Sequence, residues 1–189
     1  MLGFDRQSLE TAGERMFSLA QDLYPICRSI TGEGVRQTLK KVQDILPIAI
    51  REVPSGTPVL DWQVPQEWNI RDAYIADAGG QRVVDFQASS LHVVGYSKPV
   101  DETLAMADLL PHLHTLPEQP EWVPYRTGYF SDDWGFCLSQ RVLDRMTDPE
   151  YRVVIDADLS EGSLTYGELL IPGESEQEFL LSAHTCHPS

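Results

Sequence analysis

Residues 178–189 read Glu-Phe-Leu-Leu-Ser-Ala-His-Thr-Cys-His-Pro-Ser. The stretch 178–183 is a short apolar run, which is typical of a buried strand. His184, Cys186 and His187 follow it, so two imidazoles and a thiol gather past the carboxyl end of that strand. In open α/β sheets this edge holds ligands and metals, and imidazole and thiolate are ligands that zinc favours. The stretch therefore predicts an α/β fold with a zinc site, within which the chain stops.

Other interpretations of these three side chains stay open. Two histidines three residues apart are often solvated or structural, and it is the position after a strand that favours ligation by His184 and His187. Cys186 could be a metal ligand, a catalytic nucleophile or a small buried apolar residue. No Cys-His-Asn arrangement stands at a recognisable spacing in the chain. Nucleophilic catalysis by Cys186 is therefore the weakest of these hypotheses.

The amino-terminal part has the pattern of an α/β domain. Apolar residues recur at spacings of three and four over residues 9–27, which predicts a helix that ends near Pro25. A second helix is predicted over 35–46, and the alternation at 48–53 predicts a strand. The glycine-containing segment 31–35 between the helices is interpreted as a turn and helix start, although free amides there could hold an anion.

The middle of the chain, from about residue 54 to 129, is rich in proline and tryptophan and has only short apolar stretches. A hairpin with a Gly-Gly turn is predicted there, within a small β-rich module. Short strands are predicted at 74–75, 83–86 and 91–94, and a short helix at 103–110. The final third predicts strands at 136–138 and 153–155, a helix at 140–146, an extended segment at 164–171 and a turn at 172–175.

Composition excludes some classes of partner. The 189 residues carry 29 acids against 14 bases, a formal net charge of −15, which argues against nucleic acid or an anionic membrane. We find no apolar run of about 18 residues and no signal peptide, so a cytoplasmic location is expected. The three cysteines are odd in number and far apart, as expected of reduced thiols.

The remaining candidates are weaker. His92 lies in an apolar stretch and is most simply a core residue, while His112 and His114 could bind metal or lie in an ordinary surface loop. The acidic residues are too numerous for any pair to be singled out by spacing. The four tryptophans are interpreted as packing anchors, but the acids beside Trp62 and Trp68 still allow a binding groove.

Several longer sequence segments are similar to those of a known family. They stand at 28–39 (RSITGEGVRQTL), 53–57 (VPSGT), 61–70 (DWQVPQEWNI), 69–75 (NIRDAYI), 91–97 (LHVVGYS), 124–129 (PYRTGY), 134–137 (WGFC), 162–168 (GSLTYGE) and 184–189 (HTCHPS). In this combination the sequence resembles a bacterial family of zinc-aminopeptidase-like proteins, described as polysaccharide-biosynthesis proteins with an aminopeptidase-like domain. The resemblance runs nearly end to end.

The resemblance implies a zinc-aminopeptidase-like three-layer α/β body with an inserted β-rich domain, and a winged-helix-like region at the carboxyl terminus. We expect residues 1–60 and 161–189 to belong to the peptidase-like body and residues 61–160 to form the insert. A strand in related zinc aminopeptidases ends in Ala-His-x-Asp, where the His binds metal and the Asp orients it. His184 takes the place of the ligand, and His187 is a second metal candidate. Cys186 stands where the Asp would be, which puts that orienting chemistry in doubt.

Three functional hypotheses follow. The first is the amino-terminal part of a zinc-dependent hydrolase that acts on a peptide or another amide-containing small substrate. The remaining catalytic groups would come later, so residues 1–189 alone are expected to be inactive and to bind metal weakly. The second is a non-catalytic binding protein on a peptidase scaffold, linked to polysaccharide biosynthesis. The third is a thiol enzyme that uses Cys186. A homo-oligomer is an open alternative in each case.

Overall fold

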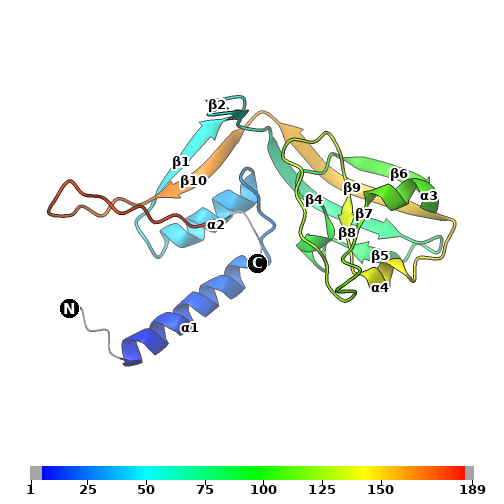
Figure 1. The fold of residues 1–189 in the computed structure, drawn as a ribbon, viewed down its shortest axis with the longest axis horizontal. Helices are drawn as coiled ribbons and strands as arrows, with labels where there is room; N and C mark the ends of the chain where they lie inside the picture. Colours follow the sequence, from blue (N-terminus) through cyan, green and yellow to red (C-terminus); the bar gives the residue numbers. More distant parts are fainter. Residues whose placement is uncertain (1–5, 186–189) are drawn as a thin grey trace.

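The computed structural model describes residues 6–185, which form a mixed α/β structure with two parts (Figure 1). One part holds the two long helices and a two-stranded sheet, and the other is built on a four-stranded sheet. The chain passes between the parts twice, entering the four-stranded sheet at β4 (Glu67–Ala76) and leaving it after β9 (Glu150–Ser160). Cys186 and His187, two of the predicted site residues, lie outside the described residues.

Both predicted helices are confirmed. They are α1 (Arg6–Leu23) and α2 (Glu33–Gln43), so the second helix ends three residues earlier than the pattern indicated. Glu33 lies in the first turn of α2, and Lys40 and Lys41 lie in its last turn, a charge order that favours the helix dipole. Val35 and Leu39 are buried on the face that contacts β10. The apolar stripe on α2 therefore faces the sheet, as its spacing predicted.

The sheet beside α2 pairs two distant segments. β1 (Ala49–Pro54) and β10 (Ser163–Glu168) run antiparallel, with Ala49 opposite Glu168 and Pro54 opposite Ser163. Both strands were predicted, although β10 ends at Glu168. A small hairpin of β2 (Pro58–Val59) and β3 (Trp62–Gln63) follows β1 and projects from the top of the molecule in Figure 1.

The second part is a lobe of residues 67–160, which we call the sheet lobe. Its strands are all antiparallel, in the order β5 (Arg82–Asp85), β4 (Glu67–Ala76), β9 (Glu150–Ser160) and β6 (Val100–Ala105). Alternate residues of β9 are buried, which is the period of a sheet with one covered face. The lobe lies within the range 61–160 predicted for the insert, and its strands 74–75, 83–86 and 153–155 are confirmed.

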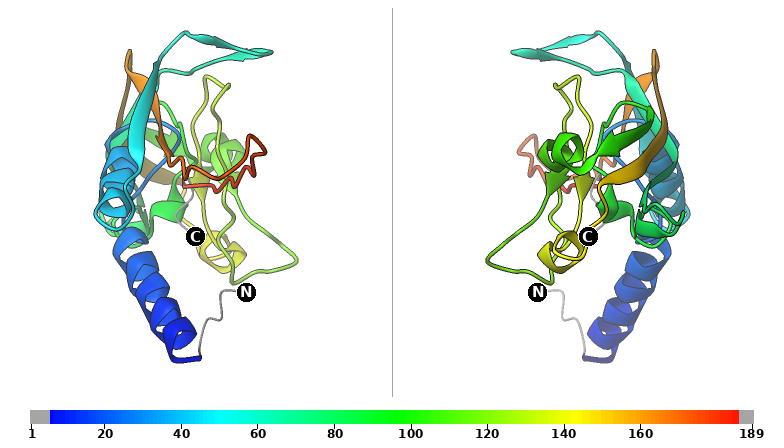
Figure 2. Two further views of the ribbon diagram at one scale, coloured as in Figure 1. Left: turned by 90° about the vertical axis from the view of Figure 1, so that its left-hand side faces the viewer. Right: turned by 90° about the vertical axis from the view of Figure 1, so that its right-hand side faces the viewer.

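Short elements cover one face of the sheet lobe (Figure 2). They are η1 (Ser90–His92), α3 (Met106–Leu109), η2 (Leu110–His112), β7 (Leu113–His114), β8 (Phe136–Cys137) and α4 (Gln140–Leu143). β7 and β8 are parallel to each other. Leu109, Phe136 and Leu138 are fully buried between these elements and the sheet. The predicted strand at 136–138 is thus confirmed as β8, and the helix at 140–146 is shorter than expected.

One prediction inside the lobe is wrong and another is confirmed only in part. Residues 91–94 were expected to be a strand, but they begin in the turn η1, because the Ser89 side chain caps its start by accepting a hydrogen bond from the Leu91 amide. The helix expected at 103–110 is confirmed in part as α3 (Met106–Leu109), but Thr103–Ala105 complete β6, where Leu104 pairs with Tyr151 of β9. Tertiary pairing overrode the local pattern at Thr103–Ala105.

The prediction of a buried strand at 178–183 is also wrong. Phe179, Leu180 and Leu181 are 98%, 91% and 95% exposed, and no strand is assigned between 169 and 185. Figure 1 shows this segment leaving β10, running out past α2 as an open loop and returning to the carboxyl end of α1. Within residues 6–185 no neighbouring strand pairs with it. An isolated strand cannot satisfy its backbone groups or bury its side chains, so the apolar run stays open.

The exposure of residues 179–181 predicts that Leu180→Ala and a matched core variant differ in stability. Leu180→Ala is expected to change the free energy of unfolding by less than about 0.5 kcal/mol, because little apolar surface is lost from a side chain already in water. Leu109→Ala, the matched control, removes a side chain that is 0% exposed and is expected to cost about 2–5 kcal/mol. Urea unfolding of the two variants measures both values. Similar costs for the two would show that Leu180 is packed, against the structure.

Candidate functional site

The loop between α1 and α2 holds the segment that contains His184. Arg28 donates from Nη1 to the carbonyls of Leu23 and Ile26, at 2.6 and 3.1 Å, and from Nε to the carbonyl of Thr185 at 2.7 Å. One guanidinium thus joins the end of α1, the loop itself and the backbone directly after His184. Because a guanidinium is a rigid fork of donors, it fixes the direction of the carbonyls that it binds. Arg28 is a positioning residue that was not predicted from the sequence, although it is the first residue of the family-like segment 28–39.

His184 is exposed, so its imidazole is accessible to a ligand. A protein zinc site needs three or four donors. Among residues 6–185 no three histidine, cysteine or acidic side chains are close enough to hold a metal. Of the predicted zinc ligands, the described part of the chain contains His184. The predicted partners Cys186 and His187 lie outside it. The metal site stays a prediction.

A buried hydrogen-bond cluster lies beneath this loop. The Thr31 hydroxyl is bonded to the Tyr96 hydroxyl and accepts a bond from the Trp68 amide at 3.1 Å. The Trp68 indole donates to the carbonyl of Ser97 at 3.0 Å, and the Trp68 and Tyr96 rings stack with centroids 5.8 Å apart. Burial raises the pKa of Tyr96 to about 12, so its hydroxyl keeps its proton. The cluster locks the loop onto the sheet lobe and confirms Trp68 as a packing anchor.

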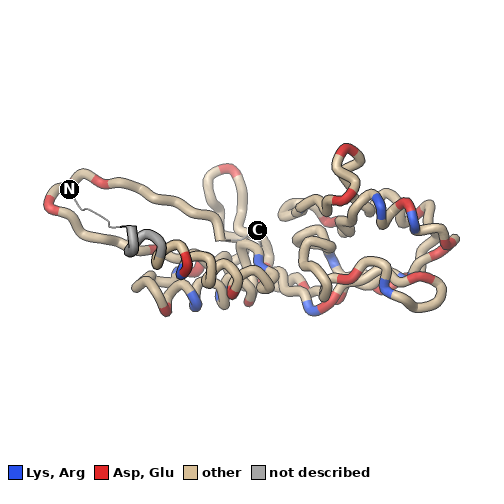
Figure 3. Tube along the Cα trace, turned by 90° about the horizontal axis from the view of Figure 1, so that it is seen from below, with Lys and Arg blue, Asp and Glu red and all other residues tan. Residues whose placement is uncertain are grey.

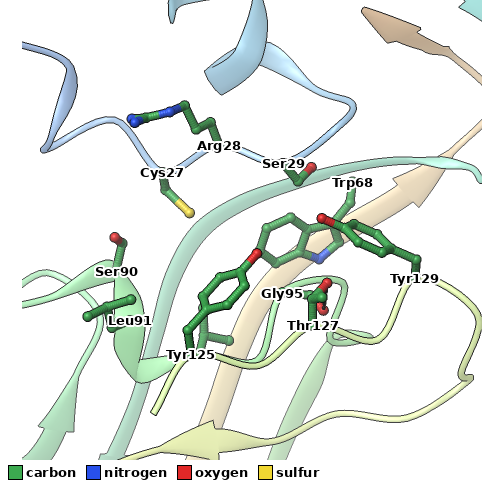
Figure 4. A pocket seen from close by; sticks show the side chains of 11 residues that line it. Cys27, Arg28, Ser29, Trp68, Ser90, Leu91, Gly95, Tyr125, Thr127 and Tyr129 are labelled. Carbon is green, nitrogen blue, oxygen red and sulfur yellow. Dashed lines mark hydrogen bonds between the residues drawn. The ribbon is translucent and has the colours of Figure 1, made fainter. Parts of the chain in front are cut away.

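Two cavities flank the loop. The smaller has about 20 Å³ and lies between Cys27, Trp68 and Tyr125 (Figure 4), which is room for about one water molecule. Figure 4 shows the Cys27 sulfur pointing into this space while the Arg28 side chain points away from it. The larger cavity has about 440 Å³ and is bordered by polar residues that include Glu33 and Asn69. Only the larger one could admit a small molecule.

Cys27 and Cys137 are free thiols, as predicted. Burial raises the pKa of each to about 11, so both stay protonated near neutral pH. A protonated thiol is a poor nucleophile and a poor metal ligand. Neither residue is therefore a candidate for chemistry in this conformation.

The turn 31–35 serves packing. Gly32 has a φ of +87°, and a Cβ at this position would lie 2.4 Å from the Trp68 carbonyl oxygen. The Glu33 amide, the first free donor of α2, already bonds the Asn69 side-chain oxygen at 2.8 Å. The interpretation of this segment as a turn and helix start is confirmed. Asn69 occupies the Glu33 amide that could otherwise have held an anion.

An ion-pair cluster connects α2 to both sheets. Arg36 donates two hydrogen bonds to Glu67 at 2.9 and 2.5 Å, one to Glu52 at 2.9 Å and one to Glu33 at 2.8 Å. It also reaches the Ser163 hydroxyl at 3.2 Å. These bonds lower the pKa of Glu67 to about 2. This cluster was not predicted, because only Glu33 and Arg36 are close enough in the sequence for their spacing to indicate an ion pair.

The other histidines have structural surroundings. His92 Nδ1 is 2.8 Å from the carbonyl oxygen of Cys137, which supports the interpretation of His92 as a satisfied interior residue. The His112 ring stacks on Trp134 at a centroid distance of 3.8 Å, and its Nδ1 lies 3.0 Å from the Trp134 carbonyl oxygen. Burial lowers the pKa of His114. No metal-binding group of three forms around either His112 or His114 within residues 6–185.

Two further features are the distribution of charged residues and the hydropathy of the helices. Figure 3 shows acidic positions spread over the described trace, with fewer basic positions among them. No helix within the described residues is both long and apolar enough to cross a bilayer.

Comparison with known structures defines the class of the fold. The chain shares its fold with a protein of Clostridium acetobutylicum whose crystal structure is titled "putative peptidase", with a TM-score of 0.86 and 48% identity over 90% of this chain and 40% of that one. Residues 67–158, almost the whole sheet lobe, match a family model described as "Domain of unknown function (DUF2172)". The molecule is therefore a mixed α/β protein with the fold of part of a peptidase-like structure.

A curated relative is similar over nearly the whole chain. The chain is 50% identical over 184 residues to a Clostridium acetobutylicum protein named "Putative polysaccharide biosynthesis protein with aminopeptidase-like domain". The alignment covers 97% of this chain and 42% of the relative. The chain thus spans about two fifths of the length of both proteins that it matches.

Proposed function

We propose that this chain contributes a metal-ligating segment to a zinc-dependent, aminopeptidase-like hydrolase that cleaves peptide or other amide bonds. The observation that carries the proposal is the hydrogen bond from Arg28 to the Thr185 carbonyl. This bond holds the backbone beside His184 against the loop between α1 and α2, where the family-like segment 28–39 begins. The peptidase-like names of the two similar proteins support the same class of reaction. The three-layer body of such an enzyme is part of this proposal.

In this proposal each residue has a separate task. His184 is the first zinc ligand and His187 the second-rank candidate, and Cys186 stands where an orienting acid would be in the resembled family. Zinc, when bound, would activate a water molecule and polarise the amide carbonyl. Arg28 fixes the backbone at Thr185, and therefore the starting direction of the His184 side chain. The remaining ligands and the general base would come from residues outside 6–185.

The test uses the natural protein that contains these 189 residues. Zinc content and hydrolysis of aminoacyl-nitroanilide substrates are measured with and without a chelator, in wild type and in His184→Ala. We expect His184→Ala to weaken zinc binding by more than about 100-fold and activity to fall with it, because removing a ligand costs more than the 10–100-fold seen when a group that supports a ligand is removed. Ser182→Ala is the matched control, because Ser182 is an exposed residue of the same segment.

The outcomes separate the hypotheses. Chelator-insensitive hydrolysis, or a His184→Ala variant that keeps full zinc and full activity, would exclude His184 as the ligand. Loss of activity on alkylation but not on chelation would favour the thiol enzyme that uses Cys186.

A second candidate function is binding without turnover. It is favoured by one observation, which is that Cys186 stands where the resembled family has an orienting acid. The words "polysaccharide biosynthesis" in the name of the relative point the same way. A protein with no hydrolysis at full zinc occupancy would support this candidate. In either case we propose a cytoplasmic protein with no nucleic-acid or membrane partner, and leave self-association to a measurement of mass in solution.

A further inference from the structure

A groove of about 640 Å³ lies where the two parts of the molecule meet, away from the segment of His184. The β2–β3 hairpin and the turn that precedes it form one side, and Phe130 with Glu161 forms the other. Its volume is within the range of sites for small molecules. The inference below does not rest on the proposed hydrolase function.

Three aromatic rings line this groove. Trp62 and Phe130 contact each other edge to face, with centroids 6.1 Å apart and planes at 77°. Tyr129 lies edge-on to Phe130 at 6.3 Å and to the buried Tyr96 at 4.8 Å, so the exposed rings connect to the core. Phe130 is 76% exposed, which leaves an open aromatic face in water. A ring held in this way is a stacking surface with little conformational freedom to lose.

Hydrogen-bonding groups of both kinds surround the rings. Gln63 and Gln66 supply amides, which donate and accept, while Asp61 and Glu161 supply carboxylates, which only accept. The Ser55 oxygen accepts a bond from the Gly162 amide at 3.1 Å, so its own hydroxyl proton is directed elsewhere. Gln66 Nε2 lies 3.5 Å from Glu161 Oε1, which joins the two sides of the groove.

The charge of the lining selects among ligands. Lysine and arginine do not line the groove, whereas two carboxylates do. Phosphates and uronic acids would therefore be repelled. A simple cation would need acceptors alone and would leave the amide donors unused. A hydroxyl group both donates and accepts, so a polyol with an apolar face matches the whole set.

The groove is formed before any ligand arrives. The Gly56 amide donates to the Val64 carbonyl at 2.8 Å, and the Val64 amide donates to the Thr57 carbonyl at 3.0 Å, which fixes the base of the hairpin. Gly56 at φ +78° and Leu60 at φ +52° adopt the left-handed conformations that its turns require. A preformed site loses less entropy on binding.

We propose that this groove binds a neutral carbohydrate, with one sugar ring stacked on Phe130 and its hydroxyls bonded to Gln63, Gln66 and Glu161. The ligand class is one or two uncharged sugar units, because the apolar face of such a ring and its hydroxyl edge match the two kinds of lining. Anionic sugar derivatives, including nucleotide sugars, are discriminated against by Asp61 and Glu161.

The test titrates residues 1–189 with cellobiose and N,N′-diacetylchitobiose, and follows binding by calorimetry and tryptophan fluorescence. Dissociation constants of about 1 mM or tighter are expected for at least one of the two sugars. Phe130→Ala should weaken binding by about tenfold through loss of the stacking ring. Trp122→Ala is the matched control, because Trp122 is 62% exposed and lies outside the groove, and it should leave binding within about twofold.

A second variant and two charged probes complete the test. Gln63→Ala should weaken sugar binding by about five- to tenfold through loss of one or two hydrogen bonds, without a change in melting temperature, since Gln63 is exposed. UDP-glucose should bind no more tightly than glucose, and glucosamine no more than about threefold more tightly. The proposal is overturned by no binding of either neutral sugar at about 10 mM, by equal effects of Phe130→Ala and Trp122→Ala, or by a clear preference for UDP-glucose.

Discussion

Gly34→Ala is expected to cost at least about 3 kcal/mol of folding free energy or to prevent folding. Gly34 lies in the first turn of α2, and a Cβ there would be 1.9 Å from the Cys27 carbonyl oxygen, 2.9 Å from the Cys27 carbonyl carbon and 3.0 Å from the Arg28 Cα. All three atoms are backbone, so no side-chain rotation relieves the overlap. The helix or the loop must move.

Gly13→Ala is the matched control. Gly13 lies in α1, and a Cβ there meets nothing within 4 Å. The same substitution should stabilise the protein by about 0.5–1 kcal/mol, because alanine loses less backbone entropy in a helix. Denaturant unfolding of both variants gives the two signs directly. A Gly34→Ala protein as stable as wild type would mean that the loop does not approach the helix this closely.

The Gly34 effect reaches the proposed site. The backbone that would be displaced belongs to Cys27 and Arg28, and Arg28 holds the Thr185 carbonyl. A Gly34→Ala protein that still folds should therefore hold His184 less firmly. Gly34, the second glycine of the segment 31–35, is thus required by packing.

Arg36→Ala is the second large expected effect, at about 2–4 kcal/mol of destabilisation. The substitution leaves Glu67, whose side chain is 12% exposed, without its main partner. It also removes the bonds from α2 to Glu52 of β1 and Ser163 of β10. Arg51→Ala is the control, because Arg51 and Glu168 are both 56% exposed and 3.4 Å apart, and such a surface pair contributes less than about 0.5 kcal/mol.

The Arg36–Glu67 pair also sets a pH dependence. Arg36, the main cause, lowers the pKa of Glu67 from its ordinary 4.5 to about 2. A carboxylate with a lowered folded-state pKa stabilises the protein above its unfolded pKa, and this contribution is lost as pH falls from about 4.5 to about 2. The loss should be about 2 kcal/mol, less than the full shift implies, because Arg36 is 26% exposed.

Unfolding free energies measured between pH 6 and pH 2.5, on the order of one half pH unit apart, would show this slope in wild type and a shallower one in Arg36→Ala. An identical slope in the two proteins would mean that Glu67 does not titrate against Arg36. Glu52, whose pKa Arg36 also lowers, adds to the difference between the two proteins. Carboxylates that do not contact Arg36 are common to both proteins and cancel in the comparison.

Local patterns predicted much of the secondary structure. The helical spacing before Cys27 and after Gly34 led to α1 and α2, and alternation led to β1. Short apolar runs indicated β5 and β10 and only residues 74–75 of β4 and 153–155 of β9. Each of these elements follows from the chain's own period, because a helix or strand must place its apolar side chains on one face. The division between the inserted β-rich domain and the peptidase-like part stays a prediction.

The failures occurred where a partner far along the chain decides. Thr103–Ala105 form a strand because β9 lies alongside them. Residues 91–94 are the exception, because the side chain that caps the turn there belongs to the nearby Ser89. The apolar run at 178–183 has strand composition, yet nothing in residues 6–185 pairs with it. The bond from Arg28 to Thr185 spans 157 positions, and no local pattern could have indicated it.

The sequence by itself determined α1, α2 and segments of β1, β4, β5, β8, β9 and β10, since these depend on residue type and short-range period. A metal ligand at His184 and the lack of a polyanionic partner stay predictions. Only the tertiary structure decided that Gly34 is needed for a close backbone approach, that Arg36 joins the two sheets, and that Trp62 and Phe130 border a groove. Contacts between distant residues depend on how whole elements pack, and that information is not contained in any short stretch of the chain.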